Sequence, residues 1–282
     1  MNYELRMFLS ILSSACIMLS IVLSGCAGID TNRTVIPLKL QVTDNLLLPF
    51  QGNKCLLDHR TGTYYIVEQN RPNIHFYRGG KQINSIGGFG TDKASFQKLS
   101  DIAIDPDGNL LVLDEFAKLI RKFSPDGKWI ADIDISTFNQ PTRFCSTQES
   151  DLIIYDSATQ ELQRISTFDG KTMFTFGRFQ VNSVSGITAS RDMVAVVSAE
   201  KDKTVLFSGM GLFLKEIPAQ MVLDQYQNQY SYQDGAVKLM GSDLLIPFGK
   251  PNAEVRLGAG AQNILLINGE NVITILPVYQ GN

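Results

Sequence analysis

Three acidic residues of this 282-residue chain stand at comparable places and could act together. Glu68, Asp114 and Asp156 each follow a run of four apolar or aromatic residues. Carboxylates that share one face of a protein can hold a cation or meet a basic partner. The favoured alternative is structural, because aspartate at a strand end commonly accepts hydrogen bonds from nearby backbone N–H groups. We therefore keep two interpretations of the three residues: a candidate ligand face, and a structural role in which they bond the backbone.

A second candidate is the segment 223–235, which holds four glutamines, one asparagine and three tyrosines. Tyrosine offers a large contact area at low entropic cost, so Tyr226, Tyr230 and Tyr232 would suit a glycan or a peptide. The alternative is an edge strand whose tyrosines pack on a neighbouring unit. Because the segment lengthens the local repeat, we predict an inserted loop or an extended hairpin.

Metal and nucleophile chemistry finds little support in the residue types. His59 and His75 are the only histidines, whereas a zinc site needs three or four convergent ligands. Residues 105–109 have the composition of a calcium loop, but Phe116 occupies the place of the bidentate glutamate, so we predict a turn. No Ser-His-Asp set, phosphate-binding glycine loop or nucleotide fingerprint occurs. We assign no catalytic residue, no metal and no cofactor.

The first 25 residues have the features of an export signal. Residues 7–23 form an apolar run after Arg6, and Leu23-Ser24-Gly25-Cys26 closely resembles the bacterial lipobox. The resemblance implies cleavage before Cys26 and lipid attachment to that cysteine. A retained membrane anchor is the alternative, but the run is short for a span and contains four serines. Ala27 follows the cysteine, which by resemblance to proteobacterial sorting favours the outer over the inner membrane.

The remaining chain repeats one plan, seen best in residues 99–129, which read as three strands joined by a tight turn and a loop and followed by a second tight turn. The turns at 105–109 and 124–127 combine proline, aspartate and glycine, which suit hairpin connections. Apolar runs end at Glu68, Asp114, Asp156 and Ser198, spaced 46, 42 and 42 residues apart, and at Phe248, another 50 residues on. A period of about 40 to 50 residues with four strands is typical of a β-propeller, and an ordinary meander or two-sheet sandwich is the alternative.

The repeat resembles the NHL repeat, whose blades carry a strand ending in Val-Ala-Asp, an Arg-Ile-containing strand and a DG turn. Residues 111–127 match this pattern well, through LVLD, IRKF and PDG, and residues 163–170 match it fairly. The other repeats are degenerate. The resemblance implies an all-β propeller, and we predict six four-stranded blades, with five as the alternative.

Ring closure predicts a composite last blade, in which a strand at 36–42 pairs with strands at 264–267 and 272–276. Domains are then expected at 1–25 (signal peptide), 26–33 (lipidated cysteine and tether) and 34–282 (propeller). Cys55 and Cys145 fall on the first strands of two non-adjacent blades, so we predict free, buried thiols.

The net charge of −3 and the lack of a basic block argue against nucleic acid as a partner. We predict a non-enzymatic binding or scaffold module of the bacterial cell envelope, held to a membrane by lipid on Cys26, with an envelope protein or a glycan as its partner. One alternative is a metal-dependent propeller hydrolase, lactonase or lyase, with a cation held by carboxylates such as Asp101, Asp114 or Asp156. Another is a carbohydrate-binding module centred on 223–235.

Overall fold

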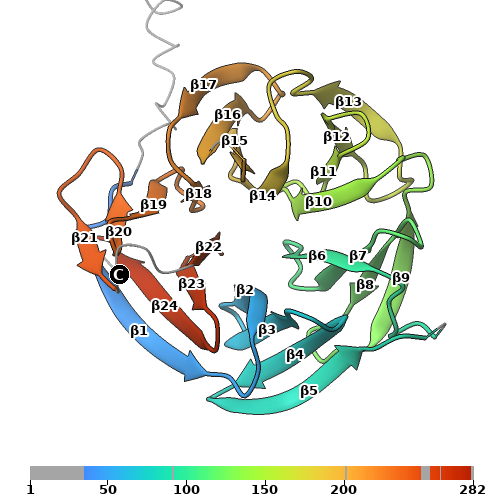
Figure 1. Cartoon of the computed structure of the whole chain (residues 1–282), viewed down its shortest axis with the longest axis horizontal. Coiled ribbons are helices and arrows are strands. Elements are labelled where there is room, and N and C mark those ends of the chain that lie inside the picture. The colour runs from blue at the N-terminus through green and yellow to red at the C-terminus, as the bar shows by residue number, and fades with distance from the viewer. Residues whose placement is uncertain (1–34, 91, 201, 249–254, 261, 281–282) are drawn as a thin grey trace, which may run out of the picture. The chain divides into compact units, whose positions relative to one another are not determined.

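A computed structural model describes residues 35–90, 92–200, 202–248, 255–260 and 262–280. Val35–Asn282 forms one compact unit of six four-stranded antiparallel sheets arranged around a centre (Figure 1). The all-β, six-bladed propeller is therefore confirmed, and the five-blade and sandwich alternatives are wrong. Within the described ranges, no helix is long and apolar enough to cross a membrane. The predicted signal peptide and lipidated cysteine lie outside the described residues.

The blades follow one another along the chain, and each contributes four consecutive strands except the last. Blades 1 to 3 consist of β2 (Gly52–Asp58), β3 (Thr63–Glu68), β4 (Asn73–Arg78), β5 (Lys81–Gly87); β6 (Leu99–Ile104), β7 (Leu110–Asp114), β8 (Leu119–Phe123), β9 (Trp129–Asp134); and β10 (Pro141–Ser146), β11 (Leu152–Asp156), β12 (Glu161–Ile165), β13 (Thr172–Phe176). Blades 4 to 6 consist of β14 (Val184–Ala189), β15 (Met193–Ser198), β16 (Lys203–Ser208), β17 (Phe213–Ile217); β18 (Met221–Leu223), β19 (Gln229–Gln233), β20 (Ala236–Leu239), β21 (Leu245–Pro247); and β22 (Arg256–Ala259), β23 (Ile264–Asn268), β24 (Asn271–Val278), β1 (Lys39–Leu47).

The core is divided among the spaces between neighbouring blades. Six clusters of buried side chains join blades 1 and 2, 2 and 3, 3 and 4, 4 and 5, 5 and 6, and 6 and 1. In β7, Leu110 and Val112 pack toward blade 1, whereas Leu111 and Leu113 pack toward blade 3. A strand whose two faces are both covered needs apolar residues at every position. This explains the uninterrupted apolar runs that mark the repeat.

The sixth blade closes the ring by joining the two ends of the described chain. β1 pairs antiparallel with β24, from Lys39 opposite Val278 to Leu47 opposite Asn271. The strand predicted at 36–42 thus begins slightly later and runs further than expected, while its partners lie where they were predicted. A bulge between Val42 and Asp44 interrupts the pairing.

The prediction for blade 5 was wrong in one respect. The segment 223–235 is not an insertion, because it supplies the first turn and the second strand, β19, of this blade. Phe248, taken as the end of a second strand, directly follows the fourth strand, β21. Leu257 belongs to β22, the first strand of the composite blade. The predicted number of blades is still correct, because the longer interval that ends at Phe248 was counted as one blade.

The first strands of blades 1 to 4 share a bulge near their beginning. Register shifts lie between Gly52 and Lys54, Leu99 and Asp101, Pro141 and Arg143, and Val184 and Gly186. A bulge leaves one residue unpaired and re-aims its neighbours. A polar residue occupies the position skipped by each register shift, namely Asn53, Ser100, Thr142 and Ser185.

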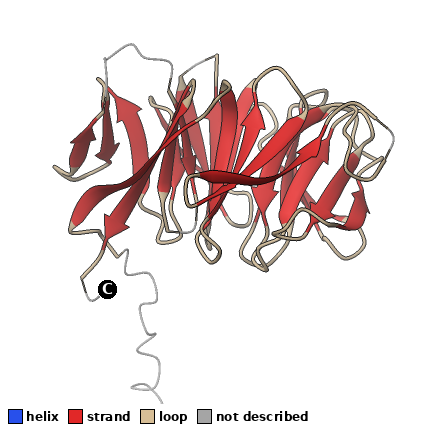
Figure 2. Ribbon diagram, turned by 90° about the horizontal axis from the view of Figure 1, so that it is seen from below, coloured by secondary structure: helices blue, strands red, loops and turns tan. Residues whose placement is uncertain are grey.

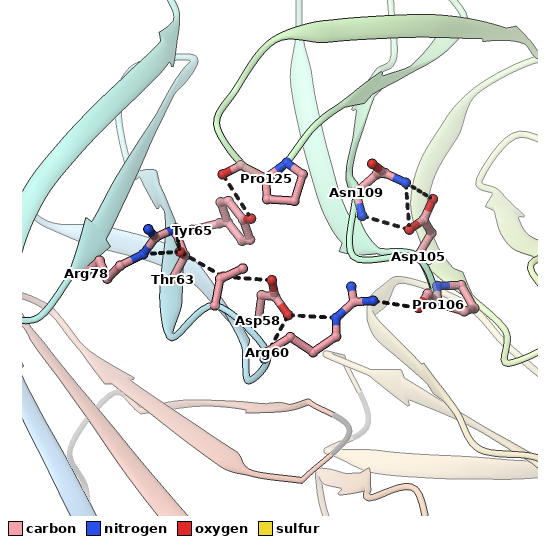
Figure 3. A network of polar contacts seen from close by, with 10 residues as sticks. Asp58, Arg60, Thr63, Tyr65, Arg78, Asp105, Pro106, Asn109 and Pro125 are labelled. Carbon is pink, nitrogen blue, oxygen red and sulfur yellow. Dashed lines mark hydrogen bonds and ion pairs between the residues drawn. The ribbon is translucent and has the colours of Figure 1, made fainter.

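The propeller has two unlike faces, whose loops are seen edge-on in Figure 2. We call the face with the first-to-second and third-to-fourth strand turns the turn face, and the opposite one the mouth face. On the turn face, Arg60 donates a hydrogen bond to the Pro106 carbonyl at 3.0 Å and Tyr65 donates one to the Pro125 carbonyl at 3.5 Å, which links blades 1 and 2 (Figure 3). Gly108 is favoured there because its φ is +86°, a backbone conformation that L side chains rarely adopt.

Candidate binding site at the central mouth

Asp114 and Asp156 lie inside their blades rather than on a ligand face. Both are fully buried. The Asp114 carboxylate accepts backbone N–H groups of Gln97 and Lys98 at 3.0 Å each, and of Ala117 at 3.3 Å. The Asp156 carboxylate accepts three backbone N–H groups at equivalent places, at 2.7 to 3.0 Å. Each aspartate thus ties the entrance of its blade to the following loop, the structural role that the sequence left open beside the ligand face.

Glu68 occupies the same place in blade 1 but binds side chains. Its carboxylate contacts His75 Nε2 and Asn73 Nδ2, each at 3.2 Å, and Arg71 lies 3.7 Å away. His75 also packs against the Phe50 ring, with centroids 4.2 Å apart. Because Glu68 is already surrounded by these donors and the other two acids are buried, the three carboxylates form no common face in this structure.

The two cysteines of the propeller are free and buried, as predicted. Burial raises the pKa of both thiols, that of Cys145 to about 12. A protonated, buried thiol behaves as a small hydrophobic side chain rather than as a nucleophile.

The tyrosine-rich segment forms a buried polar cluster on the turn face. The Asp224 carboxylate accepts hydrogen bonds from the Tyr230 hydroxyl at 2.9 Å and the Tyr279 hydroxyl at 2.7 Å. It also accepts Asn228 Nδ2 at 2.9 Å, and Asn228 in turn donates to the Val35 carbonyl at 3.0 Å. The cluster, which we call the terminal clasp, therefore binds both ends of the described chain to blade 5.

The tyrosines of this segment have different surroundings. Tyr230 is fully buried in the clasp, and the half-buried Tyr226 packs edge-on against Tyr279, with ring centroids 4.8 Å apart. Tyr232 is half-buried and packs beside the apolar cluster of blades 5 and 6. Burial, reinforced by the neighbouring Asp224 charge, raises the pKa of Tyr230 and of Tyr279 far above the ordinary tyrosine range. Packing on the adjacent blade, the alternative left open above, describes Tyr230.

A hollow of about 420 Å³ opens on the mouth face, where the first strands of blades 1 to 4 begin. We call it the mouth pocket. Asn53, Ser100, Thr142 and Arg143 line it from three first strands, together with residues of the adjacent loops. An adjoining hollow of about 360 Å³ shares Glu115 with it. No motif predicted the pocket, because several of its residues lie at the starts of the first strands, outside the apolar runs that mark the repeat.

One ion pair lines the mouth pocket, and a second lies next to its lining residues. Lys98 Nζ lies 2.8 Å from the Glu115 carboxylate, which also accepts the Ser100 hydroxyl at 2.5 Å. One residue further along the first strands, Lys54 Nζ lies 2.5 Å from the Asp101 carboxylate. Glu115 and Asp101 are buried, whereas both lysines are partly exposed. Each pair cancels its own charge.

Arg143 joins three blades through backbone carbonyls. Its Nε donates to the Ser185 carbonyl of β14 at 3.0 Å. Its Nη1 donates to the Ser100 carbonyl of β6 at 3.3 Å and to the Thr142 carbonyl of its own strand at 2.7 Å. The guanidinium is therefore held in one orientation at the wall of the mouth pocket.

The carboxylates that could hold a cation in the centre do not fit that role. Asp101 accepts the backbone N–H groups of Ile102 and Phe144, each at 3.0 Å, in addition to Lys54. Asp114 and Asp156 are saturated by backbone donors. Among the described residues, no three His, Cys, Asp or Glu side chains gather closely enough to hold a metal ion.

The likeness to known proteins is one of fold. No family model matches the chain, and no curated protein matches its sequence significantly. Among solved structures, virginiamycin B lyase from Staphylococcus aureus is 12% identical, with a TM-score of 0.57 over 84% of this chain and 99% of that one. A gluconolactonase from Xanthomonas campestris is 10% identical, with a TM-score of 0.60 over 86% and 96%. The WD40 domain of Neurospora crassa Pan2 is 9% identical, with a TM-score of 0.56 over 84% and 95%. Identities this low show the propeller fold alone.

Proposed function

We propose that this chain is an NHL-like propeller of the bacterial cell envelope, anchored by lipid on Cys26, that binds a ligand or partner protein at the mouth pocket. The observation that carries the proposal is that Arg143 and Lys98 line a hollow whose other lining residues are mostly polar, on a rigid disc. Loops and strand ends held by a rigid scaffold are the usual location of binding residues. The ordered guanidinium reduces the entropic cost of binding.

The positions of the two ends support an outward-facing pocket. The described chain begins at Val35 on the turn face, where the terminal clasp holds it. Only Ala27 to Thr34 separate it from Cys26. A short tether that joins the turn face would direct the mouth face away from the bilayer, where a periplasmic or surface partner could reach it.

The runner-up is a propeller hydrolase, lactonase or lyase that works at the same mouth. Its support is the pocket, which polar and charged residues help to line, and the fact that two of the similar structures are a lyase and a gluconolactonase. A metal-dependent enzyme is less well supported, because Asp101, Asp114 and Asp156 already bind donors of the protein itself. The glycan-binding alternative is weaker still, because Tyr230 presents no surface.

The test is site-specific photo-crosslinking in intact cells. A photoreactive phenylalanine analogue replaces Phe116, which is 65% exposed beside the mouth pocket, or Asp107, which is exposed on the turn face. We expect a discrete adduct from position 116 and none from position 107. Adducts from position 107 alone would refute a binding site at the mouth.

The lipid anchor is tested separately by mass spectrometry of the N-terminal peptide from the membrane fraction. We expect a diacylglyceryl group on Cys26, and loss of membrane association in Cys26→Ser. An unmodified cysteine, or a retained residue 1–25 segment, would contradict the anchor.

Metal content of the purified protein and a thermal melt in chelator test the enzymatic runner-up, which predicts a stoichiometric divalent ion whose removal lowers the Tm.

A further inference from the structure

Arg143 carries a charge that the described part of the chain does not neutralise. Arg60, Arg71, Arg121, Arg164 and Arg178 each have a carboxylate within 4 Å. The described hydrogen bonds of Arg143 all go to backbone carbonyls, and no described carboxylate pairs with it. Arg143 is half-buried, and a partly desolvated guanidinium that contacts carbonyl dipoles but lacks a counter-ion favours an anion beside it.

The bonding pattern leaves one side of the guanidinium available. Arginine has five N–H donors, of which the carbonyls of Ser185, Ser100 and Thr142 use those on Nε and Nη1. The two N–H groups on Nη2 have no acceptor among the described residues. The three carbonyls come from three blades, so a ligand would meet the donors already in place.

Two neutral side chains that can donate hydrogen bonds line the same pocket. The side chains of Asn53 and Thr142 line the mouth pocket and make no hydrogen bond with a described residue. An amide and a hydroxyl can each donate to an oxygen anion. Together with Nη2 they make a donor set drawn from blades 1 and 3.

The charge balance indicates how much negative charge the mouth pocket accepts. Lys98 is paired with Glu115 and Lys54 with Asp101, whereas no described carboxylate pairs with Arg143. A carboxylate carries one negative charge and would neutralise it. A phosphate dianion would bring an excess negative charge close to the buried Glu115 and Asp101.

We infer that the mouth pocket binds a carboxylate, which Arg143 Nη2 holds with help from Asn53 and Thr142. This inference rests on the proposed function, whose binding site it specifies. The volume of about 420 Å³, space for roughly a dozen water molecules, accommodates a small organic acid or the C-terminal residues of a peptide.

Isothermal titration of the full chain in detergent micelles, at constant ionic strength and pH 7, tests the inference. The probes are N-acetylalanine, its neutral amide and inorganic phosphate. We expect N-acetylalanine to bind, the amide to show no binding, and phosphate to bind more weakly. N-acetyl-trialanine distinguishes the two sources: tighter binding than N-acetylalanine indicates a peptide end, and equal binding indicates a small acid.

The variants locate the site. Arg143→Gln should weaken N-acetylalanine binding by about tenfold or more, because a charge-assisted hydrogen bond is lost. Arg178→Gln is the matched control, since Arg178 is exposed and pairs with Glu161 in the outer part of blade 3, and it should leave binding unchanged. A melt of each variant without ligand shows whether it is folded, and Arg143→Lys, which keeps the charge but loses the planar donors, should retain part of the affinity.

The inference is overturned if the amide binds as well as the acid, if phosphate binds more tightly, or if folded Arg143→Gln binds as the parent does. These results are independent of the photo-crosslinking test, which asks only whether a partner binds at the mouth face. A crosslinked partner at position 116 without carboxylate binding would reject the carboxylate while leaving the mouth as the binding site. Carboxylate binding without any crosslink at position 116 would reject the proposed envelope partner.

Discussion

The terminal clasp and the mouth pocket are both polar, yet they differ in whether their polar groups are satisfied. In the clasp, Asp224 accepts hydrogen bonds from two tyrosine hydroxyls, an asparagine amide and two backbone N–H groups, and it is 2% exposed. At the mouth, Arg143 keeps an unpaired charge beside an open hollow. Saturated, buried networks hold a fold together, whereas groups with unused bonding capacity are free to meet a ligand.

The largest effect expected concerns stability and lies in the clasp. Asp224→Ala leaves Tyr230, Tyr279 and Asn228 without their shared acceptor, and should lower the free energy of unfolding by about 3 to 5 kcal/mol. Urea denaturation measures this. Asp107→Ala, on the same face but exposed, is the control and should stay within about 0.5 kcal/mol of the parent. Equal stabilities of the two variants would show that the clasp does not stabilise the fold.

Alkaline pH should weaken the clasp. The pKa of Tyr230 and Tyr279 is raised in the folded protein above the ordinary tyrosine value of about 10, so the folded state keeps protons that the unfolded state releases. The stability from this shift is complete below pH 10 and is lost as the pH rises above it. The loss is about 1.4 kcal/mol per pH unit for each tyrosine.

Urea denaturation at pH 8 and pH 11 measures that loss. Tyr279→Phe, which has no group to titrate, should show a smaller difference between the two pH values than the parent. A parent protein equally stable at both would contradict the raised pKa values.

Glu115→Gln should move stability and binding in opposite directions. It removes the ion pair with Lys98, which costs about 1 kcal/mol or less because Lys98 is partly exposed. It also removes a negative charge from the mouth pocket, so carboxylate binding should tighten by about fivefold. Denaturation and titration with N-acetylalanine check the two parts. Weaker carboxylate binding would show that Glu115 acts by positioning Lys98 and not by its charge.

The smallest effect belongs to a neutral donor of the mouth pocket. Thr142→Ala should change stability by about 0.5 kcal/mol or less, since its side chain makes no described hydrogen bond. It should weaken carboxylate binding by a few-fold, as one neutral hydrogen bond is lost. Thr137→Ala, exposed on the loop before blade 3, is the matched control. Identical titrations for both variants would remove Thr142 from the binding wall.

The fold followed from the sequence because strands buried on both faces leave an unmistakable apolar signature. Leu110 to Leu113 and Leu152 to Tyr155 recur at the blade period, and the aspartate that closes each run has one repeated structural duty. Blade 5 was misread because its second strand, β19, reads Gln-Tyr-Ser-Tyr-Gln. No feature of that polar stretch indicates that Tyr230 is buried and bonded to Asp224, which lies five residues before the start of β19.

The mouth pocket could not be predicted because its residues converge only when the ring closes. Arg143 meets Ser100 and Ser185 across 43 and 42 residues, and the sequence offers no way to tell an arginine that faces carbonyls from one that faces solvent. A signal was nonetheless present: polar residues recur at the blade period at the start of the first strands, in Asn53, Ser100, Thr142 and Ser185. Polar residues that recur at the blade period can therefore indicate a shared site, just as recurring apolar residues indicate buried strands.

Hydrogen exchange followed by mass spectrometry of the full chain, with and without N-acetylalanine, tests the contrast between the two regions most directly. We expect peptides covering 224–230 to exchange slowly and to keep the same exchange rate when the acid is added. Peptides covering 95–100 and 139–145 should exchange faster and gain protection with the acid. Rapid exchange in the clasp, or protection gained there and not at the mouth, would contradict the assignment of structure to one region and binding to the other.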